Sequence, residues 1–300
     1  MQHIAEFVIA LTAFVGLITS LFVFHKFWAK TTKTIWVRLI IMVWLLISEI
    51  WFIVNNQVFE MYILKDGEWI INSKFMYFEL CNLLTVTGAI LMFMPTKLNL
   101  DMLLPLAIIA PIIVLIVPTQ ESQSWSFANF RYWNYYFGHI GIIFGYLYIY
   151  LYDFTGARLS WKSMRRSMAF ALFFLTFVMV WNMAFVPNGH NPLDPAPPGS
   201  TITDLNNYWG PNYVYKFILY YLGLGTQSLL AQYFLMIFVL GPVIMLVGWT
   251  IIYFVRPIYA DRGTEKLKYN VKEDILGFKT TFTKANMKQI FQTTIKKIKP

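Results

Sequence analysis

Seven apolar stretches of about 20 residues follow one another along the chain, and they constrain its fold more than any motif does. A helix of that length spans the hydrocarbon core of a bilayer. The stretches are Ile4–His25, Ile35–Val54, Phe75–Met94, Leu100–Val117, Phe130–Tyr152, Met168–Val186 and Leu229–Val255. Only 13% of the residues are charged, against about a quarter in soluble proteins. The sequence therefore predicts an all-α integral membrane protein, a bundle of about seven transmembrane helices.

The basic residues predict the orientation of this bundle. Twenty of the 24 Lys and Arg residues lie in segments that seven crossings would place on one side, and such residues accumulate on the cytoplasmic side. We therefore expect a multi-pass plasma-membrane protein with its N-terminus outside and its C-terminus in the cytoplasm. The net charge of +9 then reflects topology and attraction to anionic inner-leaflet lipid. The same reasoning argues against nucleic-acid binding.

Two segments stand apart from the predicted spans. An outer loop, residues 187–228, carries six prolines with several Gly and Asn residues, which indicates a long loop or lid. Within it, Tyr215–Leu224 is apolar but too short to cross, which is typical of a re-entrant or interfacial piece. We divide the chain into a transmembrane domain, residues 1–257, which includes this loop, and a basic cytoplasmic tail, residues 258–300.

Polar residues inside the predicted spans gather at one depth. Such residues are costly in a membrane and are functional candidates by default. At 1.5 Å of rise per residue, six of them from four spans lie roughly 6 to 14 Å below the outer ends of their helices. They are Glu49, Glu79, Cys81, Asn134, His139 and Asn182. A shared layer predicts a cavity that opens toward the outer face.

Cys81 and His139 determine what chemistry this layer can perform. Cys81 is the only cysteine, so it cannot form an internal disulfide. An imidazole can take a thiol's proton and activate it as a nucleophile, and a carboxylate can orient the imidazole. Either Glu79 or Glu49 can fill the orienting role. Donors to a developing oxyanion are available from Asn134, Asn182 or the amides around Asn212.

Three stretches carry a resemblance to a known family. They are Glu79–Leu83 around Cys81, the Tyr-Phe-Gly-His sequence Tyr136–His139, and the Asn-Tyr-Val-Tyr sequence Asn212–Tyr215. In these the chain resembles the YwaF-like bacterial membrane proteins, which are related to transmembrane acyltransferases of ether-phospholipid remodelling. Two positions depart from the family pattern, because Glu79 stands where the family has a His and Tyr77 where it has a Pro.

The resemblance implies a multi-helix fold in which a cysteine takes an acyl chain as a thioester and a histidine assists. It assigns the nucleophile to Cys81 and the base to His139. We expect Asn134 and Asn182 to contribute to substrate binding, and the matching stretches supply four further candidates. These are Asn82, Asn212, Tyr213 and Tyr215.

Our first hypothesis is a membrane-embedded lipid acyltransferase or acyl hydrolase that acts on a phospholipid or another acyl lipid and needs no cofactor and no metal. The second is a small proton-coupled transporter or substrate-binding membrane component, because Gly241-Pro242 interrupts the last span and transporter sites use such interruptions. The third is a metal site formed by the carboxylates, the thiol and the imidazole. Protein partners and the choice between transfer and hydrolysis stay open.

Overall fold

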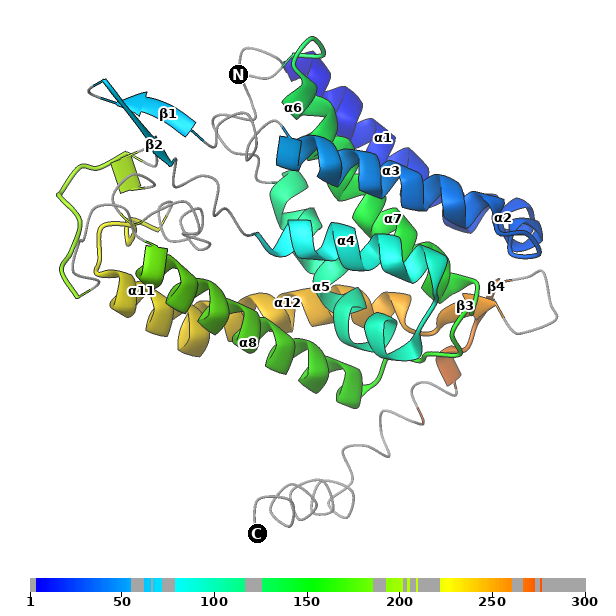
Figure 1. The fold of residues 1–300 in the computed structure, drawn as a ribbon. Helices are drawn as coiled ribbons and strands as arrows, with labels where there is room; N and C mark the ends of the chain where they lie inside the picture. The colour runs from blue at the N-terminus through cyan, green and yellow to red at the C-terminus, as the bar shows by residue number, and fades with distance from the viewer. Residues whose placement is uncertain are drawn as a thin grey trace.

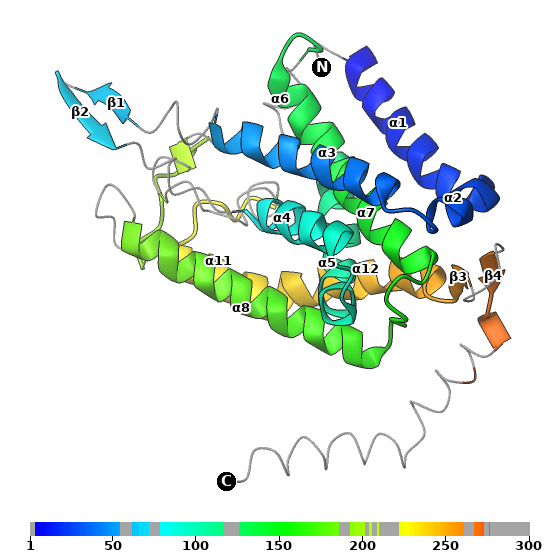
Figure 2. The same ribbon diagram turned by 45° about the vertical axis from the view of Figure 1, so that its right-hand side comes forward.

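The computed structural model describes residues 4–54, 62–65, 67–71, 79–116, 126–185, 193–201, 204–205, 209, 222–260, 267–272 and 276. These residues form a mainly helical protein (Figures 1 and 2). The helices are α1 (Ile4–Val23), α2 (His25–Thr31), α3 (Trp36–Ile53), α4 (Leu80–Phe93), α5 (Lys97–Ile116), α6 (Phe130–Tyr132), the π-helical turn η4 (Trp133–Phe137), α7 (Gly138–Leu151), α8 (Trp161–Phe185), α11 (Leu229–Leu235), the π-helical turn η5 (Met236–Leu240) and α12 (Gly241–Val255).

Within the described residues, five helices are long and apolar enough to cross a membrane: α1, α3, α5, α8 and the continuous run from α11 to α12. The other two predicted spans are also helical but less regular. Helix α4 has 14 residues, and the span that begins at Phe130 is divided by η4. The all-α membrane class is thus confirmed. The count of seven crossings and the orientation stay predictions.

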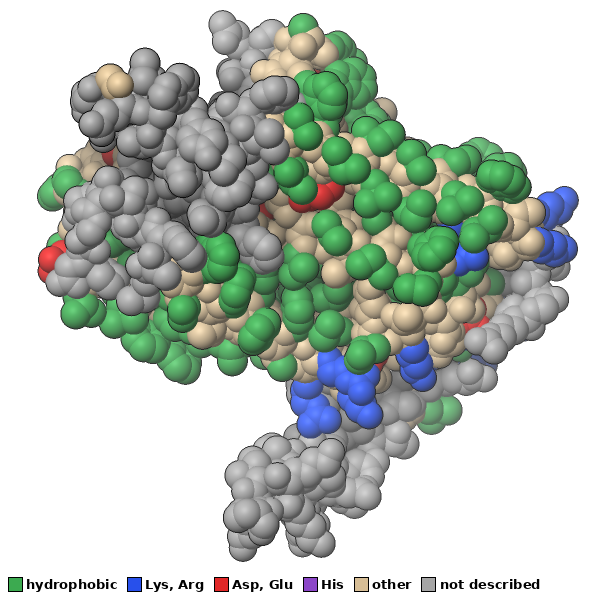
Figure 3. All heavy atoms as spheres, in the orientation of Figure 1, with side chains coloured by type: hydrophobic (Ala, Val, Ile, Leu, Met, Phe, Trp, Pro, Cys, Tyr) green, Lys and Arg blue, Asp and Glu red, His purple; other side chains and the backbone are tan. Residues whose placement is uncertain are grey.

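The outer surface of the bundle fits a lipid environment. Large hydrophobic side chains are widely exposed on the helices, among them Ile40 at 66%, Phe238 at 71% and Phe254 at 69%. Figure 3 shows such side chains spread over the helical face, with Lys and Arg gathered near α2 and the start of α8. In water so much exposed hydrocarbon would cause aggregation, whereas in a bilayer it faces lipid.

Helix α7 forms the centre of the bundle. It contacts α1, α3, α4 and α5, which surround it in Figures 1 and 2, and all but one of its residues are buried. Helix α5 in turn contacts α8 and α12. A buried carboxylate adds to the link between α5 and α8, because Arg166 and Ser163 of α8 both donate hydrogen bonds to Asp101 of α5.

A row of small residues lets α3 lie close against α7. The row consists of Gly138, Gly141 and Gly145. A Cβ atom on Gly138 would lie 2.7 Å from Ser48 Oγ, and one on Gly141 would lie 3.2 Å from Leu45 Cδ2. Such close approach between helix backbones is how helices associate tightly in membranes.

A second polar layer lies nearer the ends of the helices that we predict to be cytoplasmic. Tyr146 Oη lies 3.1 Å from Thr87 Oγ1 and donates to Asn99 Oδ1 at 3.1 Å, and Asn99 Nδ2 donates to the Thr87 carbonyl at 3.0 Å. Tyr148 and Tyr150 add bonds to Thr31 and to the Arg256 carbonyl. Tyrosine side chains are mostly apolar, so hydropathy alone does not reveal this layer.

Two short antiparallel hairpins were not predicted from the sequence. Strands β1 (Tyr62–Lys65) and β2 (Glu68–Ile71) pair in the segment after α3, with Gly67 at φ +86° between them. Strands β3 (Ile258–Ala260) and β4 (Leu267–Tyr269) pair directly after α12, at the start of the predicted basic tail. Most of that tail, and much of the predicted outer loop, lies outside the described residues.

Candidate functional site

A small cavity lies among α3, α4 and the η4–α7 segment. Six of the residues that line it were singled out from the sequence: Glu49, Glu79, Cys81, Asn82, Asn134 and His139. Ser48, Phe52, Thr85 and Tyr135 contribute to the same wall. The cavity has a volume of about 60 Å³, enough for a few water molecules, since one water requires roughly 10 to 15 Å³ of such space. Figure 3 shows acidic side chains at the surface beside α3 and α4.

Cys81 lies in the first turn of α4, not deep inside a helix. The predicted span began at Phe75, but the helix begins at Leu80, after Glu79 in an extended conformation with φ −109° and ψ 152°. The first N–H groups of a helix have no partner within it and form the positive end of the helix dipole. At that position the N–H groups of Cys81 and Asn82 are available to an anion.

The His139 ring is held in one tautomer by a backbone carbonyl. Its Nδ1 atom forms a hydrogen bond with the carbonyl oxygen of Tyr135. The centroids of the Tyr135 and His139 rings lie 5.0 Å apart. A carbonyl can only accept, so Nδ1 carries the proton and Nε2 of the neutral ring holds a lone pair. The ring therefore presents a base at Nε2.

This bond changes the expected role of the carboxylates. The sequence favoured Glu79 or Glu49 as the group that orients His139, but the Tyr135 carbonyl occupies Nδ1 instead. Glu49 is 8% exposed and accepts a 3.1 Å hydrogen bond from Asn82 Nδ2. Glu79 lies at the N-cap of α4 and lines the cavity. Both carboxylates thus line the cavity, one from α3 and one from the N-cap of α4, while the Tyr135 carbonyl holds the imidazole.

Asn134 also differs from its expected role as a donor to the substrate. Its Nδ2 atom donates to the Ser48 carbonyl at 2.6 Å and to Ser48 Oγ at 3.0 Å. The two hydrogens of the Asn134 Nδ2 group are therefore both used in bonds to Ser48 of α3. This pairing was not predicted, because Ser48 was not among the candidate residues.

The remaining candidates have no described side chain. Asn182 belongs to α8, but its side chain is outside the described part of the structure, as are Asn212, Tyr213 and Tyr215. Among the described residues, no group of three or more His, Cys, Asp or Glu side chains is arranged to hold a metal ion. Gly241-Pro242 does not break its helix, because η5 carries the chain continuously from α11 into α12. The observation that favoured a transporter is therefore weakened.

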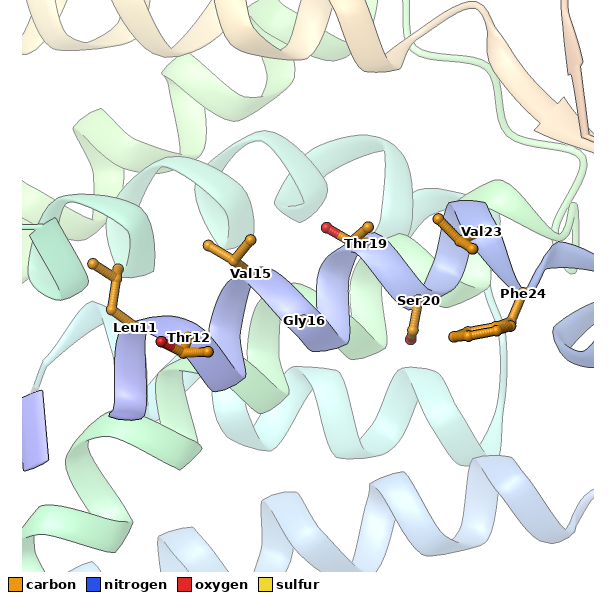
Figure 4. Close-up of a pocket in the computed structure, with 8 residues that line it drawn as sticks. All are labelled: Leu11, Thr12, Val15, Gly16, Thr19, Ser20, Val23 and Phe24. Atoms are coloured by element: carbon orange, nitrogen blue, oxygen red, sulfur yellow. The ribbon is translucent and has the colours of Figure 1, made fainter. Parts of the chain in front are cut away.

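A larger hollow of about 540 Å³ lies against α1. All the residues that line it come from this one helix and its end, as Figure 4 shows. They are Leu11, Thr12, Val15, Gly16, Thr19, Ser20, Val23 and Phe24. None of them is ionisable, so this hollow offers no acid, base or strong nucleophile.

Comparison with known proteins places the chain in a family. No curated protein and no solved structure gives a match. The model of the TMEM164 family matches residues 1–253, which include every described residue of the cavity and all the helices down to α12. This multi-pass membrane protein therefore belongs to the TMEM164 family.

Proposed function

We propose that this protein moves or hydrolyses an acyl chain of a membrane phospholipid or related lipid through a thioester on Cys81. The observation that carries the proposal is that a thiol from α4 and an imidazole from α7 line one cavity. The thiol lies at a helix N-terminus and the imidazole presents Nε2 as a base, which are the two features that activate a cysteine. The resemblance to acyltransferases of ether-phospholipid remodelling supports the same chemistry.

The reaction runs in two halves. His139 Nε2 takes the proton of the Cys81 thiol, and the thiolate sulfur attacks the ester carbonyl carbon of the lipid. The tetrahedral intermediate places its negative oxygen at the N–H groups of the first turn of α4, a contribution that is worth a few kcal/mol in comparable sites. When the C–O bond breaks, the lyso-lipid leaves with the proton from His139, and the acyl group remains on sulfur.

The second half regenerates the enzyme. Water, or the hydroxyl of an acceptor lyso-lipid, gives its proton to Nε2 and attacks the thioester carbonyl. The C–S bond breaks, and the thiolate recovers the proton from the imidazolium. Water as acceptor gives a free fatty acid, and a lyso-lipid gives a new phospholipid.

The small volume of the cavity sets one condition on this mechanism. A space of about 60 Å³ holds the reacting carbonyl group but not an acyl chain. The chain must extend out of the cavity into the surrounding hydrocarbon, or side chains such as Phe52 and Tyr135 must move. In the predicted orientation the cavity lies toward the outer leaflet, which would supply the lipid.

The test is direct because the chain holds one cysteine, so any thioester maps to Cys81. Purified protein is incubated in micelles with phosphatidylcholine or phosphatidylethanolamine that carries an isotope-labelled acyl chain. Mass spectrometry should find an acyl adduct that hydroxylamine removes. Cys81→Ala should abolish the adduct, and His139→Ala should slow its formation by roughly 10² to 10⁴-fold.

His25 provides a matched control for His139. Its Nδ1 atom also lies at hydrogen-bond distance, 3.1 Å, from a backbone carbonyl, that of Phe22, but it does not line the cavity. His25→Ala should therefore leave adduct formation unchanged. Absence of an adduct on the wild-type protein with every lipid offered, or equal rates for the two His variants, would contradict the proposal.

A further inference from the structure

The segment that carries His139 departs from regular α-helix just before it. Residues Trp133–Phe137 form the five-residue π-helical turn η4, between α6 and α7. Single π-helical turns are rare and occur frequently at functional sites. The carbonyl that fixes the His139 ring belongs to Tyr135, in the middle of this turn. The state of the turn thus determines where the acceptor for Nδ1–H lies.

Two contacts with one residue of α3 enclose this turn. On one side Asn134 Nδ2 donates to both the carbonyl and the hydroxyl of Ser48, at 2.6 and 3.0 Å. On the other side the absence of a side chain at Gly138 makes room for Ser48 Oγ, which would lie 2.7 Å from a Cβ atom there. Ser48 is only 8% exposed, so water competes little for these bonds.

We propose that Asn134 is a positioning residue that acts on the thiol through His139. Its bonds to Ser48 hold η4 in its π-helical form. The Tyr135 carbonyl in that form accepts the Nδ1 proton and so leaves the lone pair of Nε2 for Cys81. This inference rests on the proposed function in one respect, which is that Nε2 acts on the Cys81 thiol.

A backbone carbonyl that Asn134 holds in place has an advantage over a carboxylate as the acceptor for His139 Nδ1–H. A carboxylate on His139 Nδ1 would stabilise the imidazolium strongly, whereas a carbonyl fixes the tautomer without a full charge in the membrane. The cost is that a backbone carbonyl has to be held at one place. The hydrogen bonds from Asn134 to Ser48 of α3 hold the carbonyl there, because breaking them would leave an unpaired amide in an apolar surrounding.

The experiment measures alkylation of the single cysteine by iodoacetamide in the purified full chain, as a rate across pH 6 to 10. Asn134→Ala should slow the reaction at neutral pH by about tenfold. This is less than the full contribution of a general base, because the variant retains His139. The substitution should also move the midpoint of the pH profile upward. Ser48→Ala should have the same effect in weaker form, because the Ser48 carbonyl remains as an acceptor.

A second set of variants separates positioning from general structural damage. Asn99 makes the same kind of bond outside the cavity, from Nδ2 to the Thr87 carbonyl of another helix at 3.0 Å. Asn99→Ala should therefore alkylate like the wild type. In the double variant Asn134→Ala with His139→Ala, the rate should equal that of His139→Ala alone, because a residue that acts through His139 has no effect without it.

Each other outcome overturns the inference. Wild-type rates in Asn134→Ala, with His139→Ala slow, reject the role of Asn134 and leave the proposed function standing. A further loss in the double variant assigns Asn134 a structural role only. Wild-type rates in His139→Ala reject the proposed function and the inference together. If Asn134→Ala does not fold, as judged by far-UV circular dichroism, Ser48→Ala provides the same comparisons.

Discussion

The contact between Gly138 and Ser48 gives a quantitative test of how closely α3 and α7 pack. In Gly138→Ala the new Cβ atom would lie 2.7 Å from Ser48 Oγ, closer than Cβ contacts in proteins. Overpacking of this kind costs typically 1 to 3 kcal/mol. Replacing Gly by Ala within a helix stabilises it by roughly 0.5 to 1 kcal/mol, which offsets part of this cost.

Gly16 provides the matched control, because a Cβ atom there meets no other atom within 4 Å. Gly16→Ala should therefore show only the gain from helix propensity. The two Gly→Ala variants should differ in free energy of unfolding by about 1 to 3 kcal/mol, the overpacking cost alone. Equilibrium denaturation with SDS in mixed micelles, followed by far-UV circular dichroism, measures this difference.

A second substitution identifies the atom responsible. Ser48 Cβ lies 3.9 Å from the position of the new Cβ atom, which is ordinary van der Waals contact. Ser48→Ala should therefore relieve the clash, and the double variant should be more stable than the sum of the single effects by about 1 kcal/mol or more, as expected for residues in contact. Equal stability of Gly138→Ala and Gly16→Ala, or strict additivity with Ser48→Ala, would refute the reasoning.

Two further predictions follow from other parts of the structure. Tyr146→Phe removes the hydroxyl that joins Thr87 and Asn99, so it should lower the free energy of unfolding by about 0.6 to 1.7 kcal/mol, the range of such bonds in membranes; an unchanged free energy of unfolding in the same SDS assay would show that this layer adds no stability. In the loop after α8, the hydroxyl and the backbone N–H of Thr201 donate hydrogen bonds to Asp204 and lower the pKa of its carboxyl group. The stability that these bonds add is therefore present above the usual pKa of an Asp and is lost as the pH falls through the lowered value. An NMR titration should find a higher pKa for Asp204 in Thr201→Val, and an unchanged pKa would contradict this account.

The apolar stretches allowed the helices to be predicted, but not where each begins. Average hydropathy marks Phe75–Met94 as one apolar stretch, whereas α4 starts at Leu80. Glu79 adopts an extended backbone, and nothing in the local composition sets that conformation. This shift of a few residues moved Cys81 from the interior of a helix to its first turn, which changes its chemistry.

The depth of the polar residues predicted most of the described cavity lining but not the hydrogen bonds that these residues form. Counting residues from the ends of the spans grouped six residues, of which five line the cavity: Glu49, Glu79, Cys81, Asn134 and His139. The side chain of the sixth, Asn182, lies outside the described part of the structure. The acceptor for His139 is a backbone carbonyl in a π-helical turn, and neither has a sequence signature. The partner of Asn134 is a serine, a residue too common in membrane helices to stand out.

The central place of α7 bears on how the chain is made. The helices α1, α3, α4 and α5 precede it along the sequence, and each of them contacts it. During synthesis these four would enter the bilayer before the helix that binds them together, with Thr87, Asn99 and the Leu21 carbonyl still waiting for the hydroxyls of Tyr146 and Tyr152. Assembly of the complete bundle must therefore wait until α7 leaves the translocon. A truncation before Phe130 would leave α4 in contact with α3 and α5, but all three without their central partner.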